Sequence, residues 1–279
     1  MEKDRIIKMI TEVRKVNPLV HNITNYVTVN DCANAILAIG ASPIMADDLL
    51  EVEDITSISK ALVINIGTLN QRTVTSMLAA GKKANQLNIP VILDPVGAGA
   101  SGFRNDTVNS LLKTVKFSII RANLSEMSYI GGLEVSTKGV DTSKEDEGND
   151  AVMVAKNVAK RYNCVAAITG AVDVISDGER VATLSNGDKL LSKVTGTGCM
   201  TSALVGSYAG AVTNENEFDY YDAAIAGIAS MGIAGELAMS VSANGTGSYH
   251  IEIINGLSRL NEEIMGEMIK LGLVNDYEE

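Results

Sequence analysis

One segment sets the architecture of this chain, ALVINIGTLNQRTVTSMLAAGKKANQLNIPVILD (residues 61–94). It begins and ends with short apolar runs, at 61–66 and 90–94, and between them the apolar residues of 71–87 recur at helical spacing. Short apolar runs separated by helices are typical of βαβ units, whose strands are parallel and buried on both faces. The segment therefore predicts an α/β fold with helices on both sides of a parallel sheet.

The same alternation continues beyond this segment, and it changes character after residue 169. There an Asp177-Gly178 pair lies between two short apolar runs, which is typical of a hairpin, and the rest of the chain is helical in pattern. The further predicted elements are strands at 43–45, 117–123 and 164–169, a hairpin at 173–185, and helices at 26–39, 106–115, from Ser125 onward, 151–162, 199–212, 221–240 and 248–271.

The composition limits the partners of the chain. Its 279 residues include 23 Lys and Arg against 34 Asp and Glu, a formal net charge of −11, and no basic run. Binding to nucleic acid or to an anionic membrane surface is therefore disfavoured. The three cysteines match no metal-ligand spacing, and residues 1–16 lack the apolar core of a signal peptide. We therefore expect a cytoplasmic protein with reduced thiols.

No break in composition divides the chain, so residues 1–279 are predicted to form one domain. The uncharged run at 194–214 is long enough to cross a bilayer, but polar residues and glycines interrupt it. We expect instead a buried helix that packs closely through Ser202, Gly206 and Gly210, and no membrane association. Two polar segments, 134–150 and 275–279, are expected to be a solvated loop and a fraying tail.

The sequence VTGTGCMTSA (residues 194–203) is the strongest candidate for a ligand site. Gly196 and Gly198 allow a tight turn, and the helix that follows presents free N–H groups to an anion. Cys199 lies at this helix start, where the pKa of a thiol is typically lowered. The residues alone leave two alternatives open: a purely structural turn, and a cysteine nucleophile activated by His21 or His250.

Polar residues and glycines also follow the predicted strands, at the edge where an open parallel sheet binds its ligands. Each of them alone could equally cap a helix or form a turn, but their number at one edge favours a site. The candidates are Asn65, Gly67, Asp94, Gly97, Gly99, Gly102, Arg121, Asn123, Glu126, Thr169 and Gly170.

These residue types suit phosphoryl transfer, which needs charge neutralisation and positioning more than covalent help. Asp94 and Glu126 offer hard oxygen donors for Mg²⁺, either directly or through water, and Arg121 is a permanent cation for phosphate oxygens. The chain has no Walker A sequence, which excludes a P-loop kinase, and no early GxGxxG, which weakens a dinucleotide site. A protein that binds such ligands without turning them over is the alternative outside catalysis.

Five segments of the chain carry a resemblance to a known family. They are PLVHNITNYVTVNDCANAILAIGASPIMADD (18–48), NIGTL (65–69), PVILDPVGAGAS (90–101), RANLSE (121–126) and VTGTGCMTSA (194–203). In order, and over nearly the whole length of the chain, they resemble the hydroxyethylthiazole kinase family.

The resemblance implies a three-layer α/β/α ribokinase-like fold with a mostly parallel central sheet, assembled as a homotrimer with sites at the subunit interfaces. It implies ATP-dependent phosphorylation of the hydroxyl of 4-methyl-5-(2-hydroxyethyl)thiazole, with Mg²⁺. A kinase for another heterocyclic alcohol, such as a hydroxymethylpyrimidine, is the nearest alternative.

The resemblance also implies roles for single residues around the two substrates. Met45 and Gly196 match substrate-binding positions, and Arg121 and Thr169 match ATP-binding positions. Without the resemblance, Met45 would be interpreted as ordinary strand core, because methionine is a common filler of apolar gaps.

Three further residues match the family's acidic and catalytic positions. Asp94 and Glu126 match the acidic residues around Mg²⁺ and the phosphates. Cys199 falls where most ribokinase-like kinases have an aspartate base, and in this family both Cys and Asp occur there. Because an unperturbed thiol has a pKa of about 8.5, we expect Cys199 to be at most a weak base, with the glycine backbone around it more important.

Overall fold

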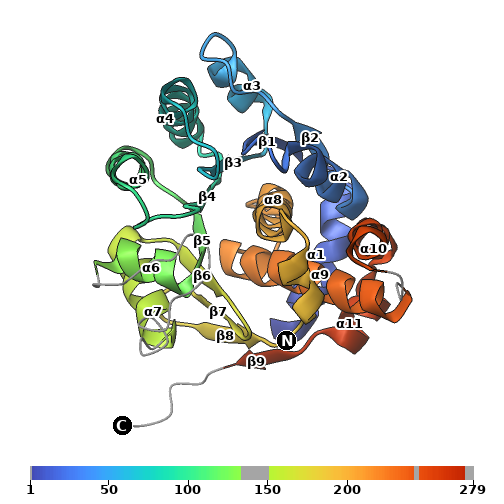
Figure 1. Cartoon of the computed structure of the whole chain (residues 1–279). Coiled ribbons are helices and arrows are strands. Elements are labelled where there is room, and N and C mark those ends of the chain that lie inside the picture. The colour runs from blue at the N-terminus through green and yellow to red at the C-terminus, as the bar shows by residue number, and fades with distance from the viewer. Residues whose placement is uncertain (1, 133–150, 242–244, 274–279) are drawn as a thin grey trace.

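The computed structural model describes residues 2–132, 151–241 and 245–273 of the chain (Figure 1). Within these ranges a nine-stranded sheet has the order β2-β1-β3-β4-β5-β6-β7-β8-β9, and helices cover both of its faces. The predicted three-layer α/β/α architecture is therefore confirmed. The polar segments expected at 134–150 and 275–279 lie outside the described residues.

The elements alternate along most of the chain, as the sequence predicts. The strands are β1 (Leu19–Ile23), β2 (Ser42–Ile44), β3 (Ala61–Asn65), β4 (Val91–Asp94), β5 (Ile119–Asn123), β6 (Val165–Thr169), β7 (Asp173–Ser176), β8 (Val181–Leu184) and β9 (Leu271–Leu273). The helices are α1 (Glu2–Val16), α2 (Val29–Ile39), α3 (Val52–Ile58), α4 (Gln71–Gln86), α5 (Gly102–Thr114), α6 (Leu124–Gly131), α7 (Ala151–Tyr162), η2 (Lys189–Lys193, a 3₁₀ helix), α8 (Thr197–Ala211), α9 (Tyr220–Val241), α10 (Thr246–Arg259) and α11 (Glu262–Met268).

The first six strands along the chain, β1 to β6, pair in parallel, and β7, β8 and β9 continue the sheet antiparallel. The hairpin predicted at 173–185 is confirmed as β7 and β8. In the parallel part the last residues of neighbouring strands lie side by side: Asn65 is opposite Asp94, and Asn123 is opposite Thr169. The polar strand ends therefore meet at one edge of the sheet.

Alternate residues of the buried strands face opposite sides, so each strand contributes to two apolar cores. In β3, Leu62 and Ile64 face the core beneath α4, α5, α6 and α7, whereas Val63 faces the core beneath α1, α2 and α8 to α11. All three side chains are buried. Burial on both faces explains why the strands consist of nearly continuous apolar runs rather than alternating patterns.

Helix α8 lies against β1, β3 and β4, in the middle of the sheet. A Cβ atom on Gly206 would collide with the side chain of Val63 and would lie 3.4 Å from Val20. A Cβ atom on Gly210 would lie 3.0 Å from Pro18. The prediction of close packing through these two glycines is confirmed, and it brings the start of α8 to the edge where the strands end.

Among the described helices, α9 is the one long and apolar enough to cross a bilayer. Of its most apolar window, however, 72% is buried inside the structure, and the helix packs against α8 and α10. The apolar surface of α9 is therefore mostly buried in the core of the protein.

Three predicted helices differ from those observed. The helix predicted at 106–115 begins already at Gly102, where Ser101 caps α5. The helix predicted at 26–39 begins only at Val29, because Asn25 accepts hydrogen bonds from the backbone N–H and the hydroxyl of Thr28 and so forms a turn before the helix. The helix predicted at 248–271 is wrong beyond Arg259, where α10 ends. Asn261 then caps a new helix, α11, by accepting from the N–H of Ile264.

The observed elements missing from the predicted set include α3, η2, β9 and the interior strand β1. Strand β1 lies between β2 and β3, although His21 and Asn22 interrupt its apolar pattern. Both side chains are buried and hydrogen-bonded: His21 bonds Thr56 and the carbonyl of Ala46, and Asn22 donates to the carbonyl of Val20. Hydrogen-bonded polar groups are compatible with an interior strand, although Oδ1 of Asn22 is buried without a hydrogen-bond partner.

The close approach of α8 predicts that Gly206→Ala destabilises the protein. The added methyl group overpacks the contact with Val63, and we expect a loss of about 1–3 kcal/mol in the free energy of unfolding, measured by urea denaturation. Gly266→Ala in α11 is the matched control, because its new Cβ would meet nothing closer than Ile7 at 3.5 Å. A loss in the control as large as that in Gly206→Ala would contradict the steric explanation.

Candidate active site

The carboxyl ends of β3 and β4 meet the first turns of α8 at a buried carboxylate, Asp94. The side chain of Asn65 donates to Asp94 Oδ2 at 2.7 Å, and Ser202 Oγ donates to the same oxygen at 2.8 Å. Ser202 was expected only to allow close helix packing, and it serves instead as a hydrogen-bond donor. It lies three residues after Cys199, so the helical spacing that puts both on one face was the available signal.

Two asparagines surround the sulfur of Cys199. Asn25 Nδ2 lies 3.0 Å and Asn65 Nδ2 lies 3.3 Å from Sγ, and Asn25 also donates to Asn65 Oδ1 at 3.2 Å. Asn65 thus uses one amide group to bond both Asp94 and Cys199. Asn25 was not predicted as a site residue, although it lies in the polar HNITN sequence that follows the apolar start of β1.

The expected lowering of the Cys199 pKa is wrong. Burial raises the pKa of this thiol and the neighbouring Asp94 carboxylate raises it further, whereas Thr28 and the two asparagine amides oppose both effects only in part. The position at a helix N-terminus does not reverse this result, because the thiol is half-buried and faces an anion. Cys199 is therefore a neutral thiol at neutral pH.

Arg121 connects the ends of β5 and β6 to the start of α8. Its Nη2 donates to Thr169 Oγ1 at 2.6 Å, and its Nη1 lies 3.9 Å from Asp94 Oδ2. A Cβ atom on Gly198 would lie only 3.0 Å from Nη1, so the missing side chain there makes room for the guanidinium. The structure thus brings together Arg121, Thr169 and the glycine turn, as their positions at strand ends predicted.

The two predicted metal ligands are both buried carboxyl groups. Burial raises the pKa of Asp94 above its usual range, despite Arg121 and the hydrogen bonds from Ser202 and Asn65. Its second oxygen, Oδ1, is buried without a hydrogen-bond partner. Such an oxygen is a place where a ligand is expected, because an unpartnered buried acceptor is costly.

Glu126 is held in a fixed position by backbone groups. Its carboxylate accepts from the N–H of Gly97 at 2.7 Å and from the N–H of Asn123 at 3.0 Å, and Asn123 in turn caps α6 by accepting from the N–H of Glu126. Burial raises the pKa of Glu126 to about 7, and the bond from Gly97 opposes that rise. Gly97 has φ +74°, a conformation that favours glycine.

Of the two residues matched to the alcohol substrate, Gly196 directly precedes the helix that carries Cys199. Gly196 precedes α8 with φ +88°, and the methyl group of Thr28 occupies the place of its missing side chain. Met45 follows the edge strand β2 and is half-buried, and it borders the same apolar core as Cys199.

The next residue, Ala46, has its carbonyl bonded to His21 Nε2 at 2.8 Å. Burial lowers the pKa of His21, so its imidazole is neutral and donates from Nε2. The other histidine, His250, pairs with Asp31 at 3.1 Å. Because both imidazoles are engaged with other groups, the alternative of a cysteine nucleophile activated by histidine has no support in the structure.

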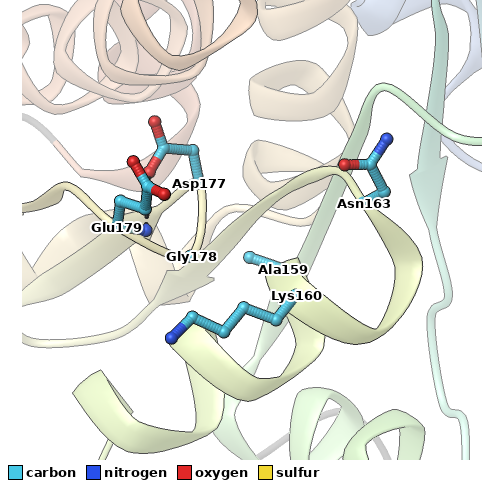
Figure 2. Close-up of a pocket in the computed structure, with 6 residues that line it drawn as sticks. All are labelled: Ala159, Lys160, Asn163, Asp177, Gly178 and Glu179. Carbon is cyan, nitrogen blue, oxygen red and sulfur yellow. Dashed lines mark hydrogen bonds between the residues drawn. The ribbon is translucent and has the colours of Figure 1, made fainter.

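A surface pocket lies elsewhere, between α7 and the turn that joins β7 to β8 (Figure 2). It is lined by Ala159, Lys160, Asn163 and the turn residues 177–179, and Figure 2 shows the Lys160 side chain alongside that turn. Since β7 runs antiparallel to β6, this turn lies at the opposite edge of the sheet from the site. The pocket is therefore distinct from the cluster around Asp94.

Comparison with known proteins finds relatives along the whole chain. A model of the hydroxyethylthiazole kinase family matches residues 10–263. A hydroxyethylthiazole kinase of Ruminiclostridium cellulolyticum is 61% identical over 269 residues, covering 96% of this chain and 97% of that protein.

Solved structures agree with this relationship. The structure of a hydroxyethylthiazole kinase protein from Pyrococcus horikoshii OT3 superposes with a TM-score of 0.86 at 37% identity, covering 97% of this chain and 99% of that one. A ribokinase-like superfamily protein from Enterococcus faecalis has a TM-score of 0.63 at 7% identity and covers 89% of each chain, a likeness of fold alone. The expected ribokinase-like fold is thereby confirmed.

The surroundings of Cys199 predict slow alkylation of its thiol. At pH 8 we expect iodoacetamide to modify Cys199 at least about tenfold more slowly than free cysteine, because its raised pKa leaves little thiolate. Asp94→Asn removes the neighbouring anion, lowers the pKa of the thiol, and speeds the reaction several-fold. Peptide mass spectrometry measures the rate, and Cys32 and Cys164, whose pKa burial raises to about 12, are internal references.

Asp173→Asn is the matched control for this experiment. Asp173 is also a buried carboxyl group, with a pKa raised by burial to about 6, but its charge is not among the causes of the Cys199 shift. An alkylation rate that rises equally in Asp94→Asn and Asp173→Asn would contradict a local effect of Asp94.

Proposed function

Because this chain belongs to the hydroxyethylthiazole kinase family, we propose that it transfers a phosphoryl group from ATP to the hydroxyl of 4-methyl-5-(2-hydroxyethyl)thiazole, as a step of thiamine salvage. The relatives that carry this name cover nearly its whole length. The observation in the structure that supports the proposal best is the meeting of Arg121, Asp94 and the first turn of α8. A cation, a carboxylate and free backbone N–H groups at one point suit a phosphate more than a neutral ligand.

Arg121 and the start of α8 are proposed to hold the phosphates of ATP. The guanidinium lies against Gly198, so a phosphate bound to the N–H groups of this turn would also contact Arg121. Thr169 fixes the guanidinium from the other side through its hydroxyl. Donors placed in advance around the moving phosphoryl group stabilise its charge without reorganisation, which is the main requirement of this chemistry.

Asp94 and Glu126 are proposed to hold Mg²⁺, directly or through water. The unpartnered Oδ1 of Asp94 and the raised pKa of both carboxyl groups fit a site that needs a cation. Within the described ranges no group of three or more His, Cys, Asp and Glu side chains forms a metal site. Two carboxylates, completed by water and phosphate oxygens, are what Mg²⁺ prefers. When bound, the cation would offset phosphate charge.

The alcohol is proposed to bind between Met45 and Gly196, with its hydroxyl beside Cys199. A small heterocyclic alcohol requires a mostly apolar pocket with few polar groups, which suits the apolar core that Met45 and Cys199 border. The neutral Cys199 is a poor base, but a loose transition state places little demand on early proton removal. Cys199 therefore contributes mainly by its position.

We infer that the protein works in the cytoplasm as a homotrimer whose sites lie at the subunit interfaces. Large apolar side chains are exposed where the chain leaves β1 and β2, notably Tyr26 at 79% and Leu50 at 94%. Tyr26 follows β1, and Leu50 follows β2 in the same segment as Met45. Exposed apolar side chains in the segments after two neighbouring strands favour burial against another subunit.

One assay tests the proposed activity directly. The purified protein is incubated with ATP and Mg²⁺ and a panel of thiazole, pyrimidine and pyridine alcohols, and the phosphorylated products are measured. We expect turnover with the hydroxyethylthiazole at least about a hundredfold above that with a hydroxymethylpyrimidine. A preference for the hydroxymethylpyrimidine would indicate a kinase for that alcohol instead. If none of the alcohols is phosphorylated, the result would favour a protein that binds its ligands without turning them over.

The raised pKa of Cys199 makes a second prediction about this activity. Cys199→Ala should retain measurable turnover, because removing a weak base costs at most about 10²-fold. Cys199→Asp should keep or raise the activity by supplying a stronger base at the same position. Folded variants that both lose all activity would contradict this role and indicate a covalent one.

A further inference from the structure

We infer that Arg104 is a positioning residue for phosphoryl transfer, a role that rests on the kinase activity proposed above. Arg104 lies in the first turn of α5, a helix whose start Ser101 caps. Neither the strand-end pattern nor the resemblance to the family assigns it a role. Its guanidinium lies between the loops that follow β3 and β4, and it donates only to backbone carbonyl groups.

In the loop after β3, Arg104 holds the oxygen side of the Ile66–Gly67 peptide. Arg104 Nη1 donates to the carbonyl of Ile66 at 2.6 Å, and Nη2 donates to the carbonyl of Gly67 at 2.7 Å. The N–H side of the same Ile66–Gly67 peptide donates to Asn65 Oδ1 at 2.8 Å. That bond fixes which end of the asparagine amide is the acceptor, so its NH₂ group faces the carboxylate and the thiol of the site.

In the loop after β4, Arg104 holds a second peptide in the same way. Its Nη1 also donates to the carbonyl of Val96, and the N–H of the Val96–Gly97 peptide donates to Glu126 Oε1 at 2.7 Å. One guanidinium thus sets the orientation of two peptide groups, and each points its N–H at a side chain of the site. A charged donor on the oxygen side also polarises each peptide and strengthens the bond on its N–H side.

Two further observations support this role. Among the described residues, Arg104 forms no ion pair, so its charge acts on the carbonyl groups alone. Its methylene groups also pack where a side chain of Gly97 would be, since a Cβ atom there would lie 3.1 Å from Arg104 Cδ. The side chain therefore supports the turn at Gly97 by contact as well as by hydrogen bonds.

The test compares three variants. Arg104→Met keeps the aliphatic stem and removes the donors, Arg104→Lys keeps the charge with fewer donors, and Arg161→Met is the control. Arg161 also donates to a backbone carbonyl, that of Gly131 at 3.1 Å, but it lies near the end of α7, toward the opposite edge of the sheet. Hydrogen exchange is followed by mass spectrometry in peptides covering 64–69 and 95–100, together with kcat and KM for ATP and for the alcohol.

We expect Arg104→Met to speed exchange at the amides of Gly67 and Gly97 at least about tenfold, with little change elsewhere. Its kcat should fall at least about tenfold while KM for the alcohol stays within about threefold, because the two loops act on Asn65 and Glu126 and not on Met45 or Gly196, between which the alcohol is proposed to bind. Arg104→Lys should recover at least about threefold of the lost kcat. Arg161→Met should match the wild type in exchange and kinetics.

The inference would be overturned if Arg104→Met exchanged its amide hydrogens in both loops at the wild-type rate. It would also be overturned if exchange became faster while kcat stayed unchanged. If Arg104→Met does not fold, Arg104→Lys decides: faster loop exchange with reduced kcat supports the role, and wild-type values for both refute it. If the wild-type chain phosphorylates no alcohol, the proposed function fails and this positioning role fails with it. The exchange measurement then still shows whether Arg104 orders the loops, so the two failures are distinguishable.

Discussion

The close contact between α8 and the middle of the sheet is the constraint on which the site depends. A helix that crosses β1 and β3 with ordinary side chains would be held farther from the sheet, and its first turn would miss the strand ends. Gly206 and Gly210 remove that obstacle. As a result Ser202 reaches Asp94, Gly198 lies against Arg121, and Cys199 comes between two asparagines.

The site combines an excess of negative charge with features that bind anions. Burial raises the pKa of both of its acidic groups: that of Asp94 above its usual range and that of Glu126 to about 7. Arg121 is a cation near both of them, and it offsets their mutual repulsion only in part. A second cation beside Arg121, as proposed above for Mg²⁺, would offset the charge that a bound phosphate adds to this site, in a chain whose net charge is already −11.

The sequence predicted the alternation of strands and helices well because burial on both faces leaves a simple apolar pattern. It failed at β1, where the buried polar residue His21 bonds a partner far along the chain, Thr56. The prediction failed again at Asn261, where a new helix, α11, begins. The helical pattern of the sequence continues through this residue and so hid its role as a cap.

In the site, the strand-end residues Asp94, Arg121 and Thr169 were predicted because parallel strands end together. Asn25, Ser202 and Arg104 were not, since their roles depend on contacts between segments. The pKa of Cys199 was misjudged for a related reason: burial and the proximity of Asp94 are properties of the folded chain and leave no local trace in sequence.

The contact between Gly196 and Thr28 has a consequence for substrate choice. The methyl group of Thr28 fills the space that a side chain at 196 would occupy, so the loop after β1 and the start of α8 pack directly against one another. This contact would set the separation between the proposed alcohol pocket and the proposed phosphate site. A fixed separation would discriminate among alcohols by the length of the arm that carries the hydroxyl.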